Sequence, residues 1–509
     1  MIPASMMIYI LDDNGKIKLF VRMFLYFLAA TFFSVGLGLN FEDDGLRHLS
    51  FANNSDIMLN WGNVYPMSLF ESYGTYDPWS FWHAFLKFII GISSFENAHI
   101  VVNLMSIFIL LTLVDLILNI EMRRYKNTIV LITLILMTFI SVRYINLRPD
   151  LISGFYVMGV YLIFNINSPH RKSIALLILS LLYIQTYYLF FVYTLAASMF
   201  MFMVKDYKNM SVLFLSTVFG FIYYYLNFGE ESLVVVKNVL LDEELREGLF
   251  VGEGVPIYSV LLLVNMKVIV VVYSILMLSI KFFFQEFLIK HKLFTFVLTL
   301  SLLWVSQGRY EELFRPLIYI LIISTAINIK KTYVRKIFVK LLKYFTIFHK
   351  EFSKSNKNIS FVLIFTVFLA FEFGVNVKNQ EEEKQVESKE LLAFFKSKEF
   401  NNSTIVFNTL GKQNYFSLYA NPTIKNIPSC SIGWKDGSSD QKSLYLKLIK
   451  REITFEELER FAIQSKADYL ILQLPINKNV DINFNNKNIK SLKILKFYKE
   501  YIVISVGKN

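Results

Sequence analysis

Long apolar runs alternate with short polar segments through most of the chain. An α-helix needs about 20 apolar residues to cross the hydrocarbon core of a membrane, and shorter runs suit helices that are broken or covered by protein. The pattern predicts an all-α polytopic membrane domain over residues 1–376 with about eleven transmembrane helices. The predicted spans are 18–39, 98–119, 128–143, 151–164, 174–185, 187–204, 211–226, 257–279, 293–306, 316–329 and 359–376.

The loops between these runs differ in charge. Residues 1–17 are mixed and the run 18–39 has full span length, so we interpret it as the first anchor rather than a cleaved signal peptide. With the N-terminus in the cytoplasm, every strongly basic loop falls on one side, as the positive-inside rule requires. The acidic segments fall on the other side: 40–97, 144–150, 227–256, 307–315 and the tail from 377.

Composition supports a multi-pass membrane protein. The 509 residues are 55% hydrophobic and 17% aromatic, which is too apolar for an ordinary soluble protein of this size. The net charge of +12 lies in short clusters between apolar runs, so it indicates topology rather than nucleic-acid binding. Cys430 is the only cysteine, which excludes an intrachain disulfide and a zinc site built from cysteines.

The polar tail, residues 377–509, is long enough for a core of its own. Short β-branched and aromatic runs predict strands, and two amphipathic stretches predict helices. These patterns indicate a small α/β domain on the extracytoplasmic side, without a phosphate-binding glycine loop or a nucleophile motif. The predicted strands are 404–407, 469–472, 492–495 and 501–504, and the predicted helices are 388–398 and 455–465.

The first outer loop, 40–97, is the longest within the membrane part. It opens with the acidic triplet Glu42-Asp43-Asp44, directly after the first span. Charge at a helix mouth beside hydrocarbon is costly, so the triplet is a functional candidate, although acids also mark the outward end of a span. Farther along, the aromatic segment 78–90 is too short to span and predicts a helix in the membrane interface, or else a buried helix of the loop.

Two further polar clusters lie at outer helix mouths. One is the segment 146–150, which contains Arg148 and Asp150; the other is 307–316, which contains Arg309, Tyr310 and Arg315. Clustered carboxylates repel one another and suit a general base, while arginines grip phosphate through paired hydrogen bonds. A base and a phosphate clamp on one membrane face point to transfer from a lipid phosphate carrier.

The arrangement resembles the C-type (GT-C) glycosyltransferases, polytopic enzymes that use polyprenyl-phosphate sugars. Protein O-mannosyltransferases and lipid A aminoarabinose transferases belong to this class. The resemblance rests on the acidic pair and amphipathic helix at residues 43–52, the aromatic segment in the long first loop, the turn Arg148-Pro149-Asp150, and the outer C-terminal domain. It covers the whole chain in architecture and only a small part of it in motifs.

The resemblance implies roles for individual residues. Asp43 matches the first acid of the family's pair, the base that activates the acceptor hydroxyl, and Asp44 matches the second. Glu42 has no counterpart, so which aspartate is the base stays open. Asp150 matches an acid that some relatives place near the active site, and Arg309 with Tyr310 sits where relatives contact the donor phosphate. Independently of the resemblance, Arg148 and Arg315 are candidate phosphate ligands, because a guanidinium is permanently charged and binds phosphate through paired hydrogen bonds.

The reaction so implied is a single inverting transfer of a hexosyl or pentosyl group from a polyprenyl phosphate to a hydroxyl of a glycan, lipid or protein. Asp43 and Asp44 offer hard oxygen ligands for Mg²⁺ or Mn²⁺, but no further ligands stand at a convincing spacing. His48 lies four residues after Asp44 on the same helical face, where a hydrogen bond that steadies the acid is favoured over a metal site.

Other functions fit the same sequence less well. A polysaccharide polymerase or ligase would share lipid-linked substrates but not this acid pair in the first loop. A transporter or flippase of envelope glycans would carry charged or Gly/Pro-broken segments in mid-span, whereas the polar residues here crowd at outer helix mouths. Gly and Pro in the loop 227–256 suit either a lid over the donor or a solvated connector.

Overall fold

A computed structural model describes 15 parts of the chain. These are residues 19–37, 45–53, 77, 79–122, 126–137, 147–187, 190–230, 266–306, 309–328, 393–408, 420–421, 423–427, 439–473, 491–497 and 501–507. The predicted span 359–376, the domain boundary at 376 and most of the loop 227–256 lie outside these residues. The chain is mostly helical with one small sheet, and it divides into two compact units that we treat separately.

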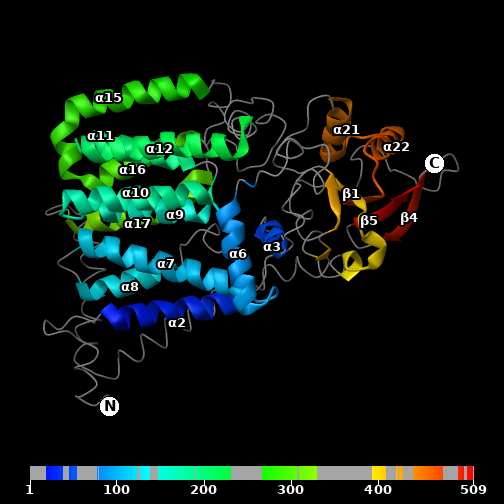
Figure 1. Ribbon diagram of the computed structural model, residues 1–509, viewed down its shortest axis with the longest axis horizontal. Coiled ribbons are helices and arrows are strands. Elements are labelled where there is room, and N and C mark those ends of the chain that lie inside the picture. Colours follow the sequence, from blue (N-terminus) through cyan, green and yellow to red (C-terminus); the bar gives the residue numbers. More distant parts are fainter. Residues whose placement is uncertain are drawn as a thin grey trace, which may run out of the picture. The chain divides into compact units, whose positions relative to one another are not determined.

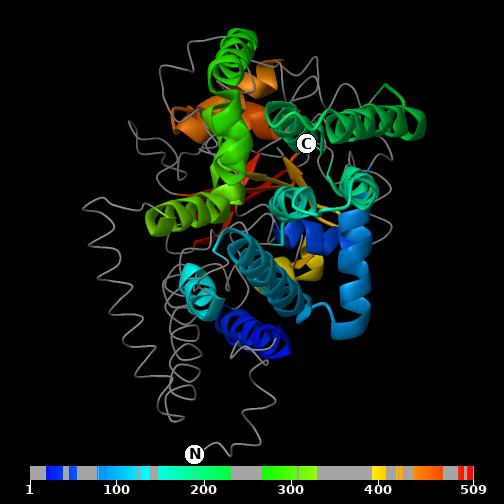
Figure 2. The same ribbon diagram turned by 90° about the vertical axis from the view of Figure 1, so that its left-hand side faces the viewer.

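Unit 1 comprises residues 1–39, 97–221 and 256–379, and its described helices run alongside one another (Figures 1 and 2). They are α2 (Leu19–Leu37), α7 (Ala98–Glu121), α8 (Lys126–Met137), α9 (Leu151–Phe164), α10 (Pro169–Thr186), α11 (Phe190–Met203), α12 (Tyr207–Phe228), α15 (Met266–Lys290), α16 (Lys292–Ser306) and α17 (Arg309–Asn328). The last turns of α12 belong to unit 2. Within the described residues, these helices cover ten of the eleven predicted spans.

Two of the helices, α7 and residues Tyr207–Asn227 of α12, are long and apolar enough to cross a membrane. The others that this part of the structure describes are shorter, less apolar or more charged, so the number of eleven spans stays a prediction. Large apolar side chains nevertheless point outward along several of them, as on α2, where Phe20 is 79% exposed. An apolar outer surface of this kind suits a lipid environment.

Helix α2 shows how the apolar pattern forms the bundle. Tyr26, Ala29, Ala30 and Phe33 recur at helical spacing and form one buried stripe, which packs against α7 through Ile107 and its neighbours. The two alanines let the helix backbones approach closely, as is common between membrane helices. The α2–α7 pair therefore has a contact face that is already visible in the sequence.

A buried polar cluster joins the same two helices. Asp115 on α7 is fully buried; Tyr26 donates a 2.8 Å hydrogen bond to its Oδ1, and Arg22 Nη2 lies 3.4 Å from its Oδ2. Asn119 donates to Asp115 Oδ2 at 3.1 Å. This acid is therefore satisfied by α2 and by its own helix, which is what a buried charge in an apolar bundle requires.

Several helices differ in extent from the predicted spans, and three of the differences have a visible cause or consequence. Helix α10 begins at Pro169 rather than 174, because Ser168 caps it and proline is favoured in the first turn. Helix α15 continues past the predicted end at 279 to Lys290, with a kink at Phe284, and the ammonium of Lys281 lies on the ring of Phe202. Helix α17 begins at Arg309, so the predicted outer loop 307–315 is wrong from that residue onward.

Unit 2 comprises residues 40–96, 222–255 and 380–509. Its C-terminal part contains a five-stranded sheet in the order β2-β1-β3-β5-β4, labelled in part in Figure 1. The first three are parallel and β5 runs antiparallel to both of its neighbours. The strands are β1 (Thr404–Phe407), β2 (Lys425–Ile427), β3 (Tyr469–Gln473), β4 (Leu492–Phe497) and β5 (Tyr501–Val506). The α/β expectation and all four predicted strands are confirmed.

The central strands of the sheet are buried on both faces, while one face of the edge strand β4 is exposed at Lys493 and Leu495. Leu470 and Leu472 face α21 (Ser439–Lys450) and α22 (Phe455–Gln464), while Phe407 on the other face lies against Phe395. Helix α22 confirms the prediction at 455–465. Strand β2 and helix α21 were not predicted, because a three-residue strand and a lysine-rich helix leave little apolar pattern. Residues 388–392 of the other predicted helix lie outside the described part.

A capping box starts α22. Thr454 accepts a hydrogen bond from Glu457 N, and Glu457 in turn accepts one from Thr454 N. The Glu457 carboxylate also contacts Lys447 Nζ of α21 at 2.5 Å. The hydrogen bond from Lys447, followed by that from the Thr454 backbone, lowers the pKa of Glu457 below its ordinary value. The ionised side chain thus ties the start of α22 to α21.

We expect this tie to weaken in acid. The pKa of Glu457 is lower in the folded chain than in the unfolded chain, where a glutamate has a pKa of about 4.3. The ionised side chain therefore stabilises the fold fully above about pH 4.3. This stabilisation is lost as the pH falls through the folded-state pKa. In hydrogen exchange of the full chain, corrected for intrinsic rates, protection of residues 455–464 should fall more steeply below pH 5 than in Glu457→Gln. The difference should be about 0.5 kcal/mol, because the pair is partly exposed. Glu452→Gln, exposed ahead of the helix, should behave as the wild type; identical profiles for all three would contradict the tie.

Candidate functional site

The helix that follows the acidic triplet is fully buried along almost its whole length. Helix α3 (Gly45–Asn53) begins one residue after Asp44, and Gly45 to Ala52 are all buried. It packs against α6 (Ser80–Ser93), the aromatic segment of the same loop. Both helices belong to unit 2, and α6 buries Trp82, His83 and Leu86 on one face while Phe88 points outward. The predicted helices after the triplet and in the aromatic segment are therefore present.

A chain of hydrogen bonds crosses the contact between α3 and α6. His48 Nδ1 on α3 lies 2.8 Å from His83 Nε2 on α6, and His83 Nδ1 lies 2.7 Å from Asp77 Oδ2. Asp77 Oδ1 accepts from the backbone N–H of Trp79 at 3.0 Å, which holds the carboxylate at the start of α6. His48 and His83 are at most 1% exposed. Two rings and a carboxylate thus form a buried relay that neither helix could build alone.

Arg47 extends the relay at its other end. Its Nη2 lies 3.5 Å from His48 Nε2, and its guanidinium carbon lies 5.2 Å from the centroid of the Trp79 ring. The edge-on contact of His48 with the same indole, 5.0 Å between ring centroids, completes the packing. A cation on an aromatic face is well placed when it is withdrawn from water, as Arg47 is at 2% exposure.

The hydrogen bonds of this relay can all form when each of them is donated in the direction from Arg47 towards Asp77. Asp77 is an acceptor, so His83 carries its proton on Nδ1 and accepts at Nε2 from His48 Nδ1–H. His48 then presents an acceptor at Nε2 to Arg47, which can only donate. In this order each of the three contacts pairs one donor with one acceptor. The relay therefore fixes the tautomer of both histidines and the position of Arg47.

The structure describes only some of the predicted site residues of the first loop. Glu42, Asp43 and Asp44 lie outside the described residues. His48 is described, and its ring engages His83. The hydrogen bond from His48 to Asp44 that the sequence favours stays a prediction. What the structure adds is that Arg47 and His48, in the first turn of the helix that the acids precede, are held rigidly by α6.

The Arg148-Pro149-Asp150 turn leads into α9 in unit 1. Asp150 occupies the N-cap position without a side-chain capping bond, and both Arg148 and Asp150 are half-buried. Just beyond it, Ser153 and Tyr183 Oη lie 2.6 Å apart, and the rings of Tyr156 and Tyr183 stack at 4.3 Å. These contacts fasten the start of α9 to α10. The structure therefore positions Asp150 on a rigid element, as a catalytic or binding acid requires.

The third predicted cluster lies in α17 rather than in a loop. Arg309 opens the helix, Tyr310 follows, and Arg315 lies two turns in, where it is half-buried before the buried Pro316. The glutamates 311 and 312 stand at the positive end of the helix dipole, which favours an early start despite the proline. The side chains of Arg309 and Tyr310 lie outside the described part. Helix α17 packs against α9 and α7.

Sequence analysis missed two members of the relay. Asp77 and His83 sit in a segment that is dominated by aromatic residues, and His83 is 35 positions from His48 in the sequence. The available signal was weak: two of the six histidines fall in the single loop 40–97. Among the described residues, no group of three or more His, Cys, Asp or Glu side chains is arranged to hold a metal ion.

Comparison with known proteins identifies a structural relative. No protein-family model matches the chain, and no curated protein matches it in sequence. Among solved structures, the chain is similar to the archaeal oligosaccharyltransferase AglB from Archaeoglobus fulgidus, which was solved in complex with an inhibitory peptide and a dolichol-phosphate. The TM-score is 0.50, over 90% of this chain and 70% of that chain, at 12% sequence identity. At this identity the likeness establishes a similar fold.

The relay predicts a measurable stability effect for its carboxylate. Asp77→Asn keeps the shape but replaces a hydrogen bond to a charged acceptor by a neutral one, which should cost about 1–2 kcal/mol in the free energy of unfolding. The His83 Nδ1–H proton resonance should also move upfield in NMR spectra of histidine-labelled protein. Glu96→Gln, an exposed acid in the same unit, makes the same charge change and should alter neither measurement. An unchanged His83 resonance in Asp77→Asn would disprove the relay.

Proposed function

We propose that the protein is a membrane glycosyltransferase that moves a sugar from a polyprenyl-phosphate carrier to an acceptor hydroxyl at the outer face of a bacterial cytoplasmic membrane. The observation that carries the proposal is the fold, which is similar to that of an oligosaccharyltransferase solved with a dolichol-phosphate and a peptide. A lipid phosphate and an acceptor in that relative are consistent with a lipid-linked donor and a separate acceptor here.

The placement of charge supports the same proposal. Described helices carry Arg148 and Asp150 at the start of α9 and Arg315 near the start of α17, and these two helices pack together. In unit 2, Arg47 is fixed in the first turn of the helix that directly follows Asp43 and Asp44. Carboxylates near permanent cations are the groups that base catalysis and phosphate binding need.

The chemistry we propose is one inverting displacement. Asp43 takes the proton of the acceptor hydroxyl, whose oxygen forms the new bond to the anomeric carbon. The bond from that carbon to the phosphate oxygen breaks, and the polyprenyl phosphate leaves with the electron pair. Arg309 and Arg315, with Arg148, neutralise the phosphate charge as it develops. Tyr310 completes the donor contacts, and Asp44 and Asp150 are the other acids of the proposal. His48, which the sequence also offers as a donor ligand, supports α3 instead, because His83 and Arg47 engage its two ring nitrogens.

The relay gives this scheme a rigid support. Because His48 and His83 hold α3 against α6, the helix that directly follows Asp44 in the sequence is fixed in place. Catalytic groups must be held to within about 0.5 Å of their productive positions, which is more precise than a flexible loop allows. If a divalent ion such as Mg²⁺ or Mn²⁺ takes part, Asp43 and Asp44 are the residues we propose as its ligands.

Asp43→Asn tests the base. Cells that lack the protein should lose one monosaccharide from their envelope glycans by mass spectrometry, and the wild-type gene should restore it. Removing a general base costs about 10²–10⁴ in rate, so Asp43→Asn should restore little or none of that sugar at normal protein levels. Glu42→Gln makes the same charge change one position earlier and should restore it fully.

The same experiment separates the alternatives. A transferase defect leaves the lipid-linked sugar accumulating at the outer face, whereas a flippase defect traps it at the inner face. Full restoration by Asp43→Asn together with failure of Asp44→Asn would move the base to Asp44. Full restoration by both variants would exclude catalysis by this acid pair.

A further inference from the structure

One end of the helix bundle in unit 1 gathers lysines and aromatic rings. Lys172 on α10 and Lys292 on α16 both lie over the ring of Phe164 at the end of α9, at 4.6 and 5.0 Å. Lys281 on α15 lies over Phe202 at the end of α11, 2.9 Å from the ring centroid, and 5.2 Å from that of Tyr207 at the start of α12. We call this region the basic end. Lys172, Lys281 and Lys292 belong to basic loops that the sequence predicts to face the cytoplasm.

A pocket of about 640 Å³ opens at the basic end, between α15 and the turn that joins α11 to α12. Two lysines, Lys205 and Lys281, line it together with the polar side chains of Ser279 and Gln285, and no carboxylate is among its lining residues. Phe282 and Phe283 form its apolar border and are 82% and 74% exposed. The pocket therefore combines positive charge, neutral hydrogen-bond donors and an exposed aromatic edge.

The backbone of the turn takes a left-handed conformation at the lysine that lines the pocket. Helix α11 ends with the N–H of Asp206 bonded to the carbonyl of Met201 and that of Lys205 bonded to the carbonyl of Phe202, which is a Schellman motif. Lys205 therefore takes the left-handed position, with φ of 64°. Glycine is the usual residue there, and a side chain costs about 1 kcal/mol. Arg451 and Lys466 take the same position after their helices, with φ of 59° and 53°, so this conformation places the Lys205 side chain at the pocket but does not by itself indicate a function.

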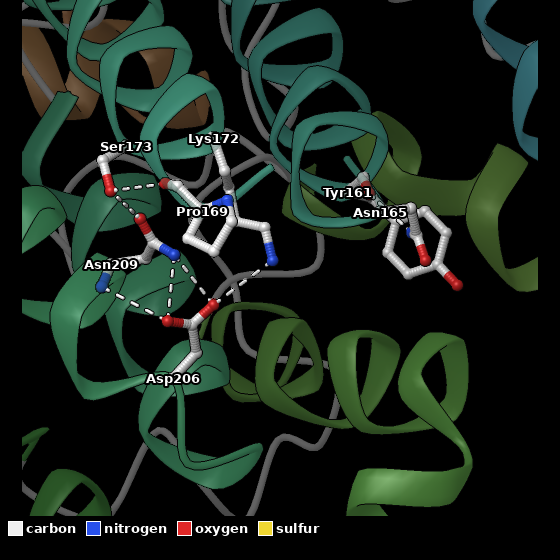
Figure 3. Close-up of polar contacts among 7 residues, drawn as sticks. All are labelled: Tyr161, Asn165, Pro169, Lys172, Ser173, Asp206 and Asn209. Carbon is white, nitrogen blue, oxygen red and sulfur yellow. Dashed lines mark hydrogen bonds and ion pairs between the residues drawn. The ribbon is translucent and has the colours of Figure 1, made fainter. Parts of the chain in front are cut away.

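The acid next to that lysine is engaged elsewhere. Figure 3 shows Asp206 accepting two hydrogen bonds from Asn209 Nδ2, at 2.9 and 2.8 Å, and facing Lys172 Nζ of α10 at 3.5 Å. Ser173 in turn donates to Asn209 Oδ1 at 2.8 Å. The Asp206 carboxylate is thus directed to α10 and balances Lys172. The charge of Lys205 and Lys281 on the pocket side is left without an acid among the lining residues.

We propose that this pocket binds the headgroup of an anionic phospholipid. Lys205 and Lys281 bind the phosphate, Ser279 and Gln285 contribute polar contacts, and Phe282 and Phe283 lie against the glycerol and upper acyl chains. Basic pockets between helices at the cytoplasmic side of a membrane are suited to anionic headgroups. Gln285 already donates to the carbonyl of Met203 at 2.8 Å, which keeps α15 beside the turn. The inference depends on unit 1 lying in a membrane and is independent of sugar transfer.

The test is lipid binding to the purified full-length protein by native mass spectrometry in detergent. Phosphatidylglycerol and cardiolipin should bind more tightly than phosphatidylcholine. Each of Lys205→Gln and Lys281→Gln should weaken binding of the anionic lipids about fivefold, since each lysine near a phosphate contributes about 1 kcal/mol. Lys290→Gln removes an exposed lysine of the same helix that does not line the pocket, so it should bind as the wild type does.

A further variant separates binding from folding. Lys205→Gly should relieve the left-handed strain and raise the unfolding temperature while it weakens phosphatidylglycerol binding, an outcome that a merely structural lysine would not give. Equal binding of phosphatidylcholine and phosphatidylglycerol, or equal losses in Lys281→Gln and Lys290→Gln, would overturn the proposal. So would preferential binding of a polyprenyl phosphate at this site. Asp43→Asn should keep full lipid binding, so failure of the transferase proposal is detected independently.

Discussion

A buried charge in an apolar bundle must find its partners inside the protein, and Asp115 shows how this constraint organises unit 1. Tyr26 and Arg22 of α2 and Asn119 of α7 surround it, so these contacts favour the register in which α2 pairs with α7. Helix α7 in turn contacts α8, α9 and α17. The position of α9, and with it that of Asp150, therefore depends on the pairing that Asp115 favours.

Helix α9 links two regions of different chemistry. Its first turn follows Arg148 and Asp150, while Phe164 at its far end supports Lys172 and Lys292. Its 14 residues separate these regions by about 21 Å at 1.5 Å per residue. Arg148 and Asp150 thus lie about one helix length from the lysines over Phe164. Groups that bind phosphate at one of these ends are too far from the other to compete for the same ligand.

The sequence predicted what apolar pattern alone determines. Helix α9 was located at 151–164, with the bounds that the structure gives, and strand β1 at 404–407, because both are uninterrupted apolar runs between turn residues. The break between α10 and α11 was also located, at Gln185-Thr186, where α10 ends. Pattern failed where a charged or proline residue lies inside a helix, as with Lys281 in α15 and Pro316 in α17. There, a tertiary contact or the helix dipole accompanies a helical stretch that the local pattern does not predict.

The candidate site was predictable only in part. The acidic pair and the turn at Arg148 stand out because charge is rare beside long apolar runs. The pairing of His48 with His83 depends on how α3 packs against α6, and no spacing in the sequence encodes a contact across 35 positions. Asp77 likewise gains its importance from a backbone turn that presents its carboxylate to His83. Such contacts follow from packing, which a single sequence does not specify.

The one-way order of donors in the relay has an electrical consequence. Arg47 cannot accept a hydrogen bond and a carboxylate cannot donate one, so the two rings between them are ordered in one direction. The four side chains form a permanent dipole through the contact of α3 with α6, positive at Arg47 and negative at Asp77. Its positive pole lies in the first turn of α3 and adds to the helix's own dipole there. The start of this helix therefore has a positive electrostatic potential that attracts an anion and needs no rearrangement of these side chains when the anion binds.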